Sequence, residues 1–172
     1  DYVIIDTAGI RKSGKIYENI EKYSVIRAMK AIERSNVCLL VINAHEGIIE
    51  HDKHIASYAL EAGKPLVIVV NKWDTVDDQN NIREFTKLIR AEFKFLSYVP
   101  IVFVSAKTKK KIHTIMPEVC KVYNNSIKEI KTSILNDVIR DAVMLNQPPS
   151  YKGKRLKIYF VSQTGIAPPK FT

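Results

Sequence analysis

Residues Leu66–Asp74 read LVIVVNKWD. The first five are all apolar, and such a run favours a strand buried on both faces of a parallel sheet. Asn71-Lys72-Trp73-Asp74 follows at once and matches the pattern N-K-x-D. A polar turn directly after a buried strand stands at the edge where open α/β sheets bind ligands. The stretch therefore predicts both a fold class and the position of a binding site.

Strand-like and helical segments alternate on both sides of this stretch. Strand-like runs occupy Tyr2–Ile5, Val37–Asn43, Pro65–Asn71 and Pro100–Ser105, and we expect the last three to be buried on both faces. Helical spacing of apolar residues occupies Glu18–Glu33, Glu50–Ala62, Asn80–Phe95 and Ile112–Ile127. This alternation predicts a doubly wound α/β domain with a mainly parallel sheet.

The pattern changes near residue 129. Lys131–Asn146 has the apolar spacing of a helix, Gln147-Pro148-Pro149 ends it, and Arg155–Gln163 alternates like an antiparallel strand. We therefore expect one domain over residues 1–129 and the start of a second, α+β domain over residues 130–172. That second part is too short for a complete domain.

Two phosphate-binding motifs compete for Asp6–Ile16, which reads DTAGIRKSGKI. A P-loop, G-x-x-x-x-G-K-[ST], needs a hydroxyl after its lysine to bind Mg²⁺, and Ile16 cannot supply one. The D-x-x-G motif fits better. Asp6 can hold the hydration shell of Mg²⁺ at the end of a strand, and the Gly9 amide can approach a γ-phosphate oxygen.

N-K-x-D supplies groups that suit a guanine base. The Asp74 carboxylate can accept hydrogen bonds from guanine N1–H and its exocyclic amine, a donor pair that adenine lacks. The Asn71 amide can bond purine N7 and brace neighbouring loops, and the Lys72 stem can cover the base.

Ser105-Ala106-Lys107 matches a third motif, S-A-K, after the next strand. The Ala106 amide can donate to guanine O6, and Ser105 can orient Asp74. Each motif alone is weak, but three in order, each at a strand's end, predict a GTPase fold.

At this point the chain resembles the EngA/Der family of bacterial ribosome-assembly GTPases. The resemblance covers the second of two tandem GTPase domains, from its switch motif onward, and the start of a KH-like domain. Its most specific stretches are Asp6–Arg11, Tyr23–Arg34, Asn71–Asp74, Thr132–Asn136 and Gly153–Gln163, followed by Pro168-Pro169. Era is the alternative family, but the G-x-x-G RNA clamp of its KH domain is absent from residues 130–172.

The resemblance implies a P-loop GTPase-type fold, GTP/GDP and Mg²⁺ as ligands, and GTP hydrolysis coupled to large-subunit assembly with rRNA contacts. It places Asp6, through water, and Gly9 beside Mg²⁺ and the γ-phosphate. The residues that it places around guanine are Asn71, Lys72, Asp74, Ser105, Ala106 and Lys107. Ile10 replaces a water-orienting glutamine, so we assign no catalytic residue.

Two departures from the family bear on activity. The family's P-loop and switch I would precede Asp1, so we expect the 172-residue chain alone to bind GTP weakly and to hydrolyse none. The alternative for this chain is an RNA- or ribosome-binding scaffold without nucleotide competence. Thr108–Lys111 also replaces a segment where the family tends to have glycine.

Composition narrows the partners. Lys and Arg total 27 against 18 Asp and Glu, and a net charge of +9 favours an anionic partner such as RNA. No apolar run approaches the roughly 20 residues of a membrane span. Cys38 and Cys120 have no metal-ligand spacing and indicate reduced thiols in a cytoplasmic protein. His51 and His54 stand near acidic residues at a predicted helix start. We interpret these histidines as solvated side chains rather than as zinc ligands.

Overall fold

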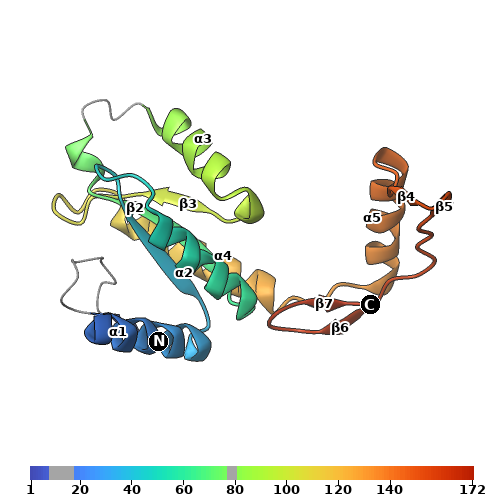
Figure 1. Ribbon diagram of the computed structural model, residues 1–172, viewed down its shortest axis with the longest axis horizontal. Helices are drawn as coiled ribbons and strands as arrows, with labels where there is room; N and C mark the ends of the chain where they lie inside the picture. Colours follow the sequence, from blue (N-terminus) through green and yellow to red (C-terminus); the bar gives the residue numbers. More distant parts are fainter. Residues whose placement is uncertain (8–17, 77–80) are drawn as a thin grey trace. The chain divides into compact units, whose positions relative to one another are not determined.

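A computed structural model gives the backbone of residues 1–7, 18–76 and 81–172, and the side chains of the same residues except 18–24. Gly9 and Ile10 lie outside these residues. The chain divides into two compact units, residues 1–123 and 124–172 (Figure 1). In the described part of the chain, no helix is long and apolar enough to cross a membrane.

The first unit is built on a parallel sheet in the order β1-β2-β3. Its strands are β1 (Cys38–Asn43), β2 (Leu66–Asn71) and β3 (Ile101–Phe103). Cys38 pairs with Leu66, and Ile68 pairs with Ile101, so all three strands run towards the same edge. The α-helices are α1 (Glu18–Arg34), α2 (Glu50–Glu61), α3 (Ile82–Glu92) and α4 (Ile115–Ser126). Short 3-10 helices are η1 (Trp73–Thr75), η2 (Lys94–Leu96) and η3 (Ile112–Thr114).

Helices cover both faces of this sheet, which confirms the α/β prediction. Alternate residues of β2 point to opposite faces, as the pleat requires. Ile68 and Val70 join a cluster with residues of α2 and α3, whereas Val67 and Val69 join a second cluster with residues of α4. Every residue of β2 from Leu66 to Val70 is buried, so this strand forms the centre of the core.

The expectation that β1 is buried on both faces is wrong. Leu40 and Ile42 are buried, but Leu39 is 44% exposed and Val41 is 56% exposed. The reason is that α4 packs against side chains of β2 and β3, and among the described residues no helix packs over Leu39 and Val41.

The strand expected over Tyr2–Ile5 is also absent, because residues 1–7 pair with no strand of the described sheets. Val3 and Ile4 are 90% and 85% exposed. A β-strand depends on hydrogen bonds to a neighbouring strand, and an apolar run without that partner stays irregular. The Tyr2 hydroxyl and the Cys120 sulfur form a hydrogen bond of 2.9 Å.

The second unit holds helix α5 (Thr132–Leu145) and two short hairpins. The hairpins pair β4 (Ser150–Tyr151) with β5 (Lys154–Arg155), and β6 (Gln163–Gly165) with β7 (Lys170–Phe171).

The continuous strand predicted over Arg155–Gln163 is wrong, since only its two ends are strands. Between them, Val161 bonds to a side chain. Its amide donates to Asn136 Oδ1, and its carbonyl accepts from Asn136 Nδ2, both at 2.8 Å. One side chain therefore satisfies both backbone groups of Val161, which a neighbouring strand would otherwise have paired.

Candidate nucleotide-binding site

The N-K-x-D turn stands at the carboxyl end of β2. Lys72 adopts a left-handed backbone with φ of 60°, which turns the chain sharply as it leaves the sheet. The next three residues form η1, and Thr75 closes the turn on the Lys72 carbonyl through its amide (3.0 Å) and its hydroxyl (2.8 Å). Lys72 is thus exposed at the carboxyl edge of the sheet, and Asp74 lies within η1.

Trp73 anchors this turn in the core. It is 6% exposed, and its ring lies 5.4 Å from that of Phe85 and 4.6 Å from that of Phe103, measured between centroids in edge contacts. Its amide donates to the Val104 carbonyl at 3.1 Å. Trp73 is therefore a packing residue, and it holds the backbone from which Asp74 projects.

Asn71 joins the two motif loops. Its Oδ1 accepts hydrogen bonds from the Lys72 amide at 2.8 Å and from the Ala106 amide at 3.0 Å. The brace between loops is thus present in the structure. The Ala106 amide, which we expected to face guanine O6, is engaged with Asn71 in this state.

Ser105 and Asp74 form the electrostatic centre of the site. Ser105 is 1% exposed. The pKa of the Asp74 carboxyl lies below its usual range, mainly because of a hydrogen bond from the Ser105 hydroxyl, with a smaller contribution from the charge of Lys107. Asp74 Oδ1 is buried and has no hydrogen-bond donor among the residues whose placement is described. Among the described residues, the site therefore holds an ionised acceptor with one oxygen left unpaired.

The segment after S-A-K is a tight loop. The Ser105 amide donates to the Lys110 carbonyl at 3.1 Å, and the Thr108 amide donates to Ser105 Oγ at 3.1 Å. Lys109 and Lys111 have left-handed backbones, with φ of 59° and 58°. The loop thus uses lysines in a conformation that glycine adopts without strain.

A cavity of about 230 Å³ opens beside Asp74 and Ser105. Its walls are completed by Trp73, Ile82, Phe103, Val104, Lys110 and Lys111. Sequence reasoning missed the wall residues Ile82 and Phe103, because each reads as ordinary core within a helix or a strand. The other four residues of the predicted guanine set are not part of these walls. They lie at the end of β2 and in the loops beside the cavity: Asn71, Lys72, Ala106 and Lys107.

The phosphate side of the predicted site is less complete. Asp6 is exposed and does not follow a strand, contrary to expectation, because residues 1–7 form none. Gly9 lies outside the described residues. The structure therefore places the six residues that were predicted to face guanine around the ends of β2 and β3, without joining Asp6 to them.

The histidine-rich start of α2 has a structural role. Asp52 Oδ2 accepts a hydrogen bond from the Ile49 amide at 3.1 Å, which caps this helix. Within residues 1–7, 18–76 and 81–172, no group of three or more His, Cys, Asp or Glu side chains could hold a metal ion.

Two family models match the chain. The model described as the Elongation factor Tu GTP binding domain matches residues 2–125. The model described as the KH-domain-like of EngA bacterial GTPase enzymes, C-terminal, matches residues 129–172. The pair covers both units of the structure.

Curated relatives match over almost the whole chain. It is 56% identical over 172 residues to GTPase Der of Geobacillus sp. (strain WCH70) and 55% identical over 172 residues to GTPase Der of Oceanobacillus iheyensis. Each alignment covers 99% of this chain and 39% of the relative. The chain thus spans well under half the length of these relatives.

Solved structures share the fold. Era in complex with MgGDPNP and nucleotides 1506–1542 of 16S ribosomal RNA has a TM-score of 0.59 and 25% identity, over 68% of this chain and 38% of that one. A probable GTP-binding protein engB has a TM-score of 0.52 and 18% identity, over 63% of this chain and 70% of that one, a likeness of fold alone.

Proposed function

The chain belongs to the EngA/Der family of GTPases, and from this premise we propose that its first unit is a guanine-specific nucleotide module. In the whole protein this module hydrolyses GTP to GDP and phosphate. The observation that carries the proposal is the ionised Asp74 carboxylate, whose buried Oδ1 lacks a donor among the described residues. An acceptor oxygen shielded from water is costly to leave unpaired, and the guanine N1–H and amine groups would remove that cost.

The remaining guanine contacts follow from the loop geometry. Asn71 keeps its Nδ2 available to purine N7 while its Oδ1 braces the loops. Lys72 and Lys107 flank the base with aliphatic stems and positive charge, and Ala106 shares its amide between Asn71 and guanine O6. On the phosphate side, we propose that Asp6 holds Mg²⁺ through water and that the Gly9 amide meets the γ-phosphate.

The partners that we propose are anionic. The net charge of +9 supports a contact with rRNA of a large-subunit precursor, in a cytoplasmic ribosome biogenesis factor. A further GTPase domain, N-terminal to this one, would complete the protein, in keeping with the 39% of each relative that the chain spans. We place the domain boundary near residue 129.

Base specificity tests the proposal. The measurement uses a hybrid in which this chain replaces the matching 39% of Geobacillus GTPase Der, titrated calorimetrically with GDP and ADP. We expect the hybrid to bind GDP in preference to ADP. Asp74→Asn should weaken the affinity for GDP by about 10- to 100-fold, because two charge-assisted hydrogen bonds are lost. The variant should gain affinity for xanthosine diphosphate, whose base carries an oxygen where guanine carries the amine.

Asp141→Asn is the matched control, since it removes the same charge from an exposed position on α5. It should leave GDP affinity unchanged. Equal binding of GDP and ADP by the parent hybrid would refute guanine specificity. For the 172-residue chain by itself, we expect weak GTP binding and no single-turnover hydrolysis.

A further inference from the structure

Helix α1 presents a row of cations on its outward side. It lies beside α2 (Figure 1), and Ala28 and Ala31 on its inner side are buried. Arg27, Lys30 and Arg34 are exposed. Steps of three and four residues bring these side chains to one side of the helix, over a rise of about 10 Å. We call the three residues the α1 stripe.

The positive charge of the α1 stripe is uncompensated. In the part of the chain that the structure describes, none of its cations forms an ion pair with a carboxylate. Glu33 is the one acid in residues 25–34, and its Oε1 accepts a hydrogen bond from the Tyr58 hydroxyl of α2 at 2.7 Å. Like charges three and four residues apart also repel each other, so the stripe costs the helix stability. A partner that supplies carboxylates would remove this cost.

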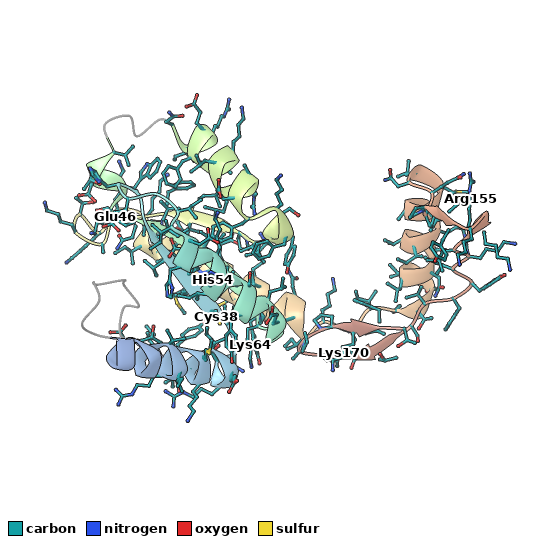
Figure 2. The ribbon with its side chains drawn as sticks, viewed as in Figure 1. Cys38, Glu46, His54, Lys64, Arg155 and Lys170 are labelled. Carbon is teal, nitrogen blue, oxygen red and sulfur yellow. The ribbon has the colours of Figure 1, made fainter. Side chains whose placement is uncertain are left out.

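The helix dipole explains only part of the stripe. A cation in the last turn of a helix is favourable, which accounts for Arg34. Lys64 adds a further cation near this end, because Ser35 Oγ lies 3.3 Å from the Cys38 sulfur and Figure 2 shows Lys64 close to Cys38. Burial raises the pKa of the Cys38 thiol, and the nearby charge of Lys64 opposes that rise. Arg27 lies about two turns before the end of the helix, where the dipole gives no reason for a cation.

An apolar side chain borders the stripe. Ile26 is 47% exposed and stands four residues before Lys30, on the same side of α1. A polypeptide can cover this side chain with one of its own, whereas a phosphate backbone gains nothing from it. Residues 25–34 also contain no aromatic ring on which a base could stack. Cations beside an apolar side chain therefore favour a polypeptide over a nucleic acid.

We propose that the α1 stripe docks an acidic helix of a partner polypeptide. Carboxylates at steps of three and four residues on that helix repeat the spacing of the stripe, so that three ion pairs form along about 10 Å. An apolar residue next to the carboxylates packs against Ile26. The inference goes beyond the proposed function, because this contact needs neither nucleotide nor RNA.

The test measures fluorescence anisotropy of a labelled peptide with the full 172-residue chain, over a series of salt concentrations. The peptide is alanine-rich and helical, with glutamates at positions i, i+3, i+4 and i+7 and a leucine on each flank of them. Arg27→Gln, Lys30→Gln and Arg34→Gln should each weaken binding about 2- to 5-fold, because one exposed ion pair is lost. The affinity of the parent chain should fall as the salt concentration rises. Ile26→Ala should weaken binding of this peptide but not of its leucine-to-alanine form.

The stripe variant combines the three glutamine substitutions, and its matched control combines Arg83→Gln, Lys87→Gln and Lys94→Gln. The control removes the same charge from exposed positions on α3 and η2. The stripe variant should bind the peptide at least about 10-fold more weakly than the parent, and the control should bind it like the parent. The thermal midpoints of both variants should stay close to that of the parent, since every substituted side chain is exposed.

Absence of peptide binding by the parent chain, or equal binding by the stripe variant, would overturn the inference. A peptide of the same composition with its glutamates spread around the helix should bind more weakly, and equal binding would reduce the contact to attraction by net charge. An equal loss of affinity for single-stranded RNA in the stripe variant would assign α1 to nucleic acid instead. The hybrid protein should bind the peptide too, and if it does not, another part of the whole protein covers α1 and no partner docks there. Guanine selectivity of the hybrid is independent of all these results.

Discussion

Asn71 Oδ1 accepts a hydrogen bond from the Ala106 amide at 3.0 Å, and this contact ties together two loops that lie 35 residues apart in the chain. The same oxygen accepts the Lys72 amide at 2.8 Å. One carbonyl oxygen thus helps to set the distance between the N-K-x-D turn and the S-A-K loop.

The two roles of Asn71 are separable by substitution. Asn71→Ala should lower the free energy of unfolding by about 1 kcal/mol, because both backbone donors lose their partner. Asn71→Asp retains an acceptor for them and should be destabilised less. Both variants should lose GDP affinity in the hybrid protein, because neither has the amide donor. Urea unfolding and calorimetry measure the two effects, and equal stability of the alanine variant and the parent would contradict the brace.

The left-handed lysines predict a stabilising change. Lys109→Gly and Lys111→Gly should each raise the free energy of unfolding by about 0.5–1 kcal/mol, since relief of the strained backbone exceeds the extra entropy of glycine in the unfolded chain. Thermal unfolding of the single variants measures this. Lys107→Gly is the control, because Lys107 does not have a positive φ, and it should not stabilise the chain.

The pKa of Asp74 predicts a pH dependence. Its folded-state pKa lies below the reference value of 3.8. The ionised carboxylate therefore stabilises the folded chain fully above the unfolded pKa, and this contribution is lost as the pH falls through the lower folded pKa.

Ser105→Ala removes the main cause of that shift, so the pKa of Asp74 should rise towards 3.8. The free energy of unfolding should then decrease less as the pH is lowered. Lys107→Gln removes a smaller cause and should raise the pKa less. Carbon-13 NMR titration of the Asp74 carboxyl between about pH 2 and pH 6 distinguishes the two. A larger rise in the lysine variant than in the serine variant would contradict the assigned order of causes.

Trp73 supports the site through packing. Trp73→Ala should lower the free energy of unfolding by about 3–5 kcal/mol, because the cavity left between Phe85 and Phe103 cannot close completely. Circular dichroism during denaturant unfolding measures the loss. Tyr98→Ala, at a residue that is 71% exposed, should change the stability by no more than about 0.5 kcal/mol.

Asn136 should stabilise the second unit. Asn136→Ala leaves the amide and the carbonyl of Val161 without their 2.8 Å partners, at a cost of about 1–3 kcal/mol. Hydrogen exchange should show the effect as faster exchange at the Val161 amide. The exchange rate in Asn146→Ala, which removes an exposed amide after α5, should match the parent.

Most elements of the first unit were predictable. The apolar runs that became β1, β2 and β3 and the helical spacing of α1 to α4 arise from local patterns, and the structure places each element within a few residues of its prediction. The motif residues followed from the same patterns, because a turn after a buried parallel strand must lie at the carboxyl edge of the sheet.

The failures share one cause. Tyr2–Ile5 and Arg155–Gln163 have the composition of strands, but a strand exists only where a neighbour supplies its hydrogen bonds. For the first segment, the described structure offers no partner strand, and in the second Asn136 takes the place of one at Val161. Local pattern records the propensity of a segment and carries no information about its partner.

The amino-acid sequence by itself determined the parallel α/β architecture, the order of its elements and the residue types of the predicted base site, because periodicity and turn chemistry are local properties. Only the tertiary structure decided that Asn71 engages Ala106, that Ser105 lowers the pKa of Asp74, and that Asp74 Oδ1 has no donor among the residues that the structure describes. Those features depend on distances between side chains from separate strands, which are established only when the sheet assembles and its loops meet.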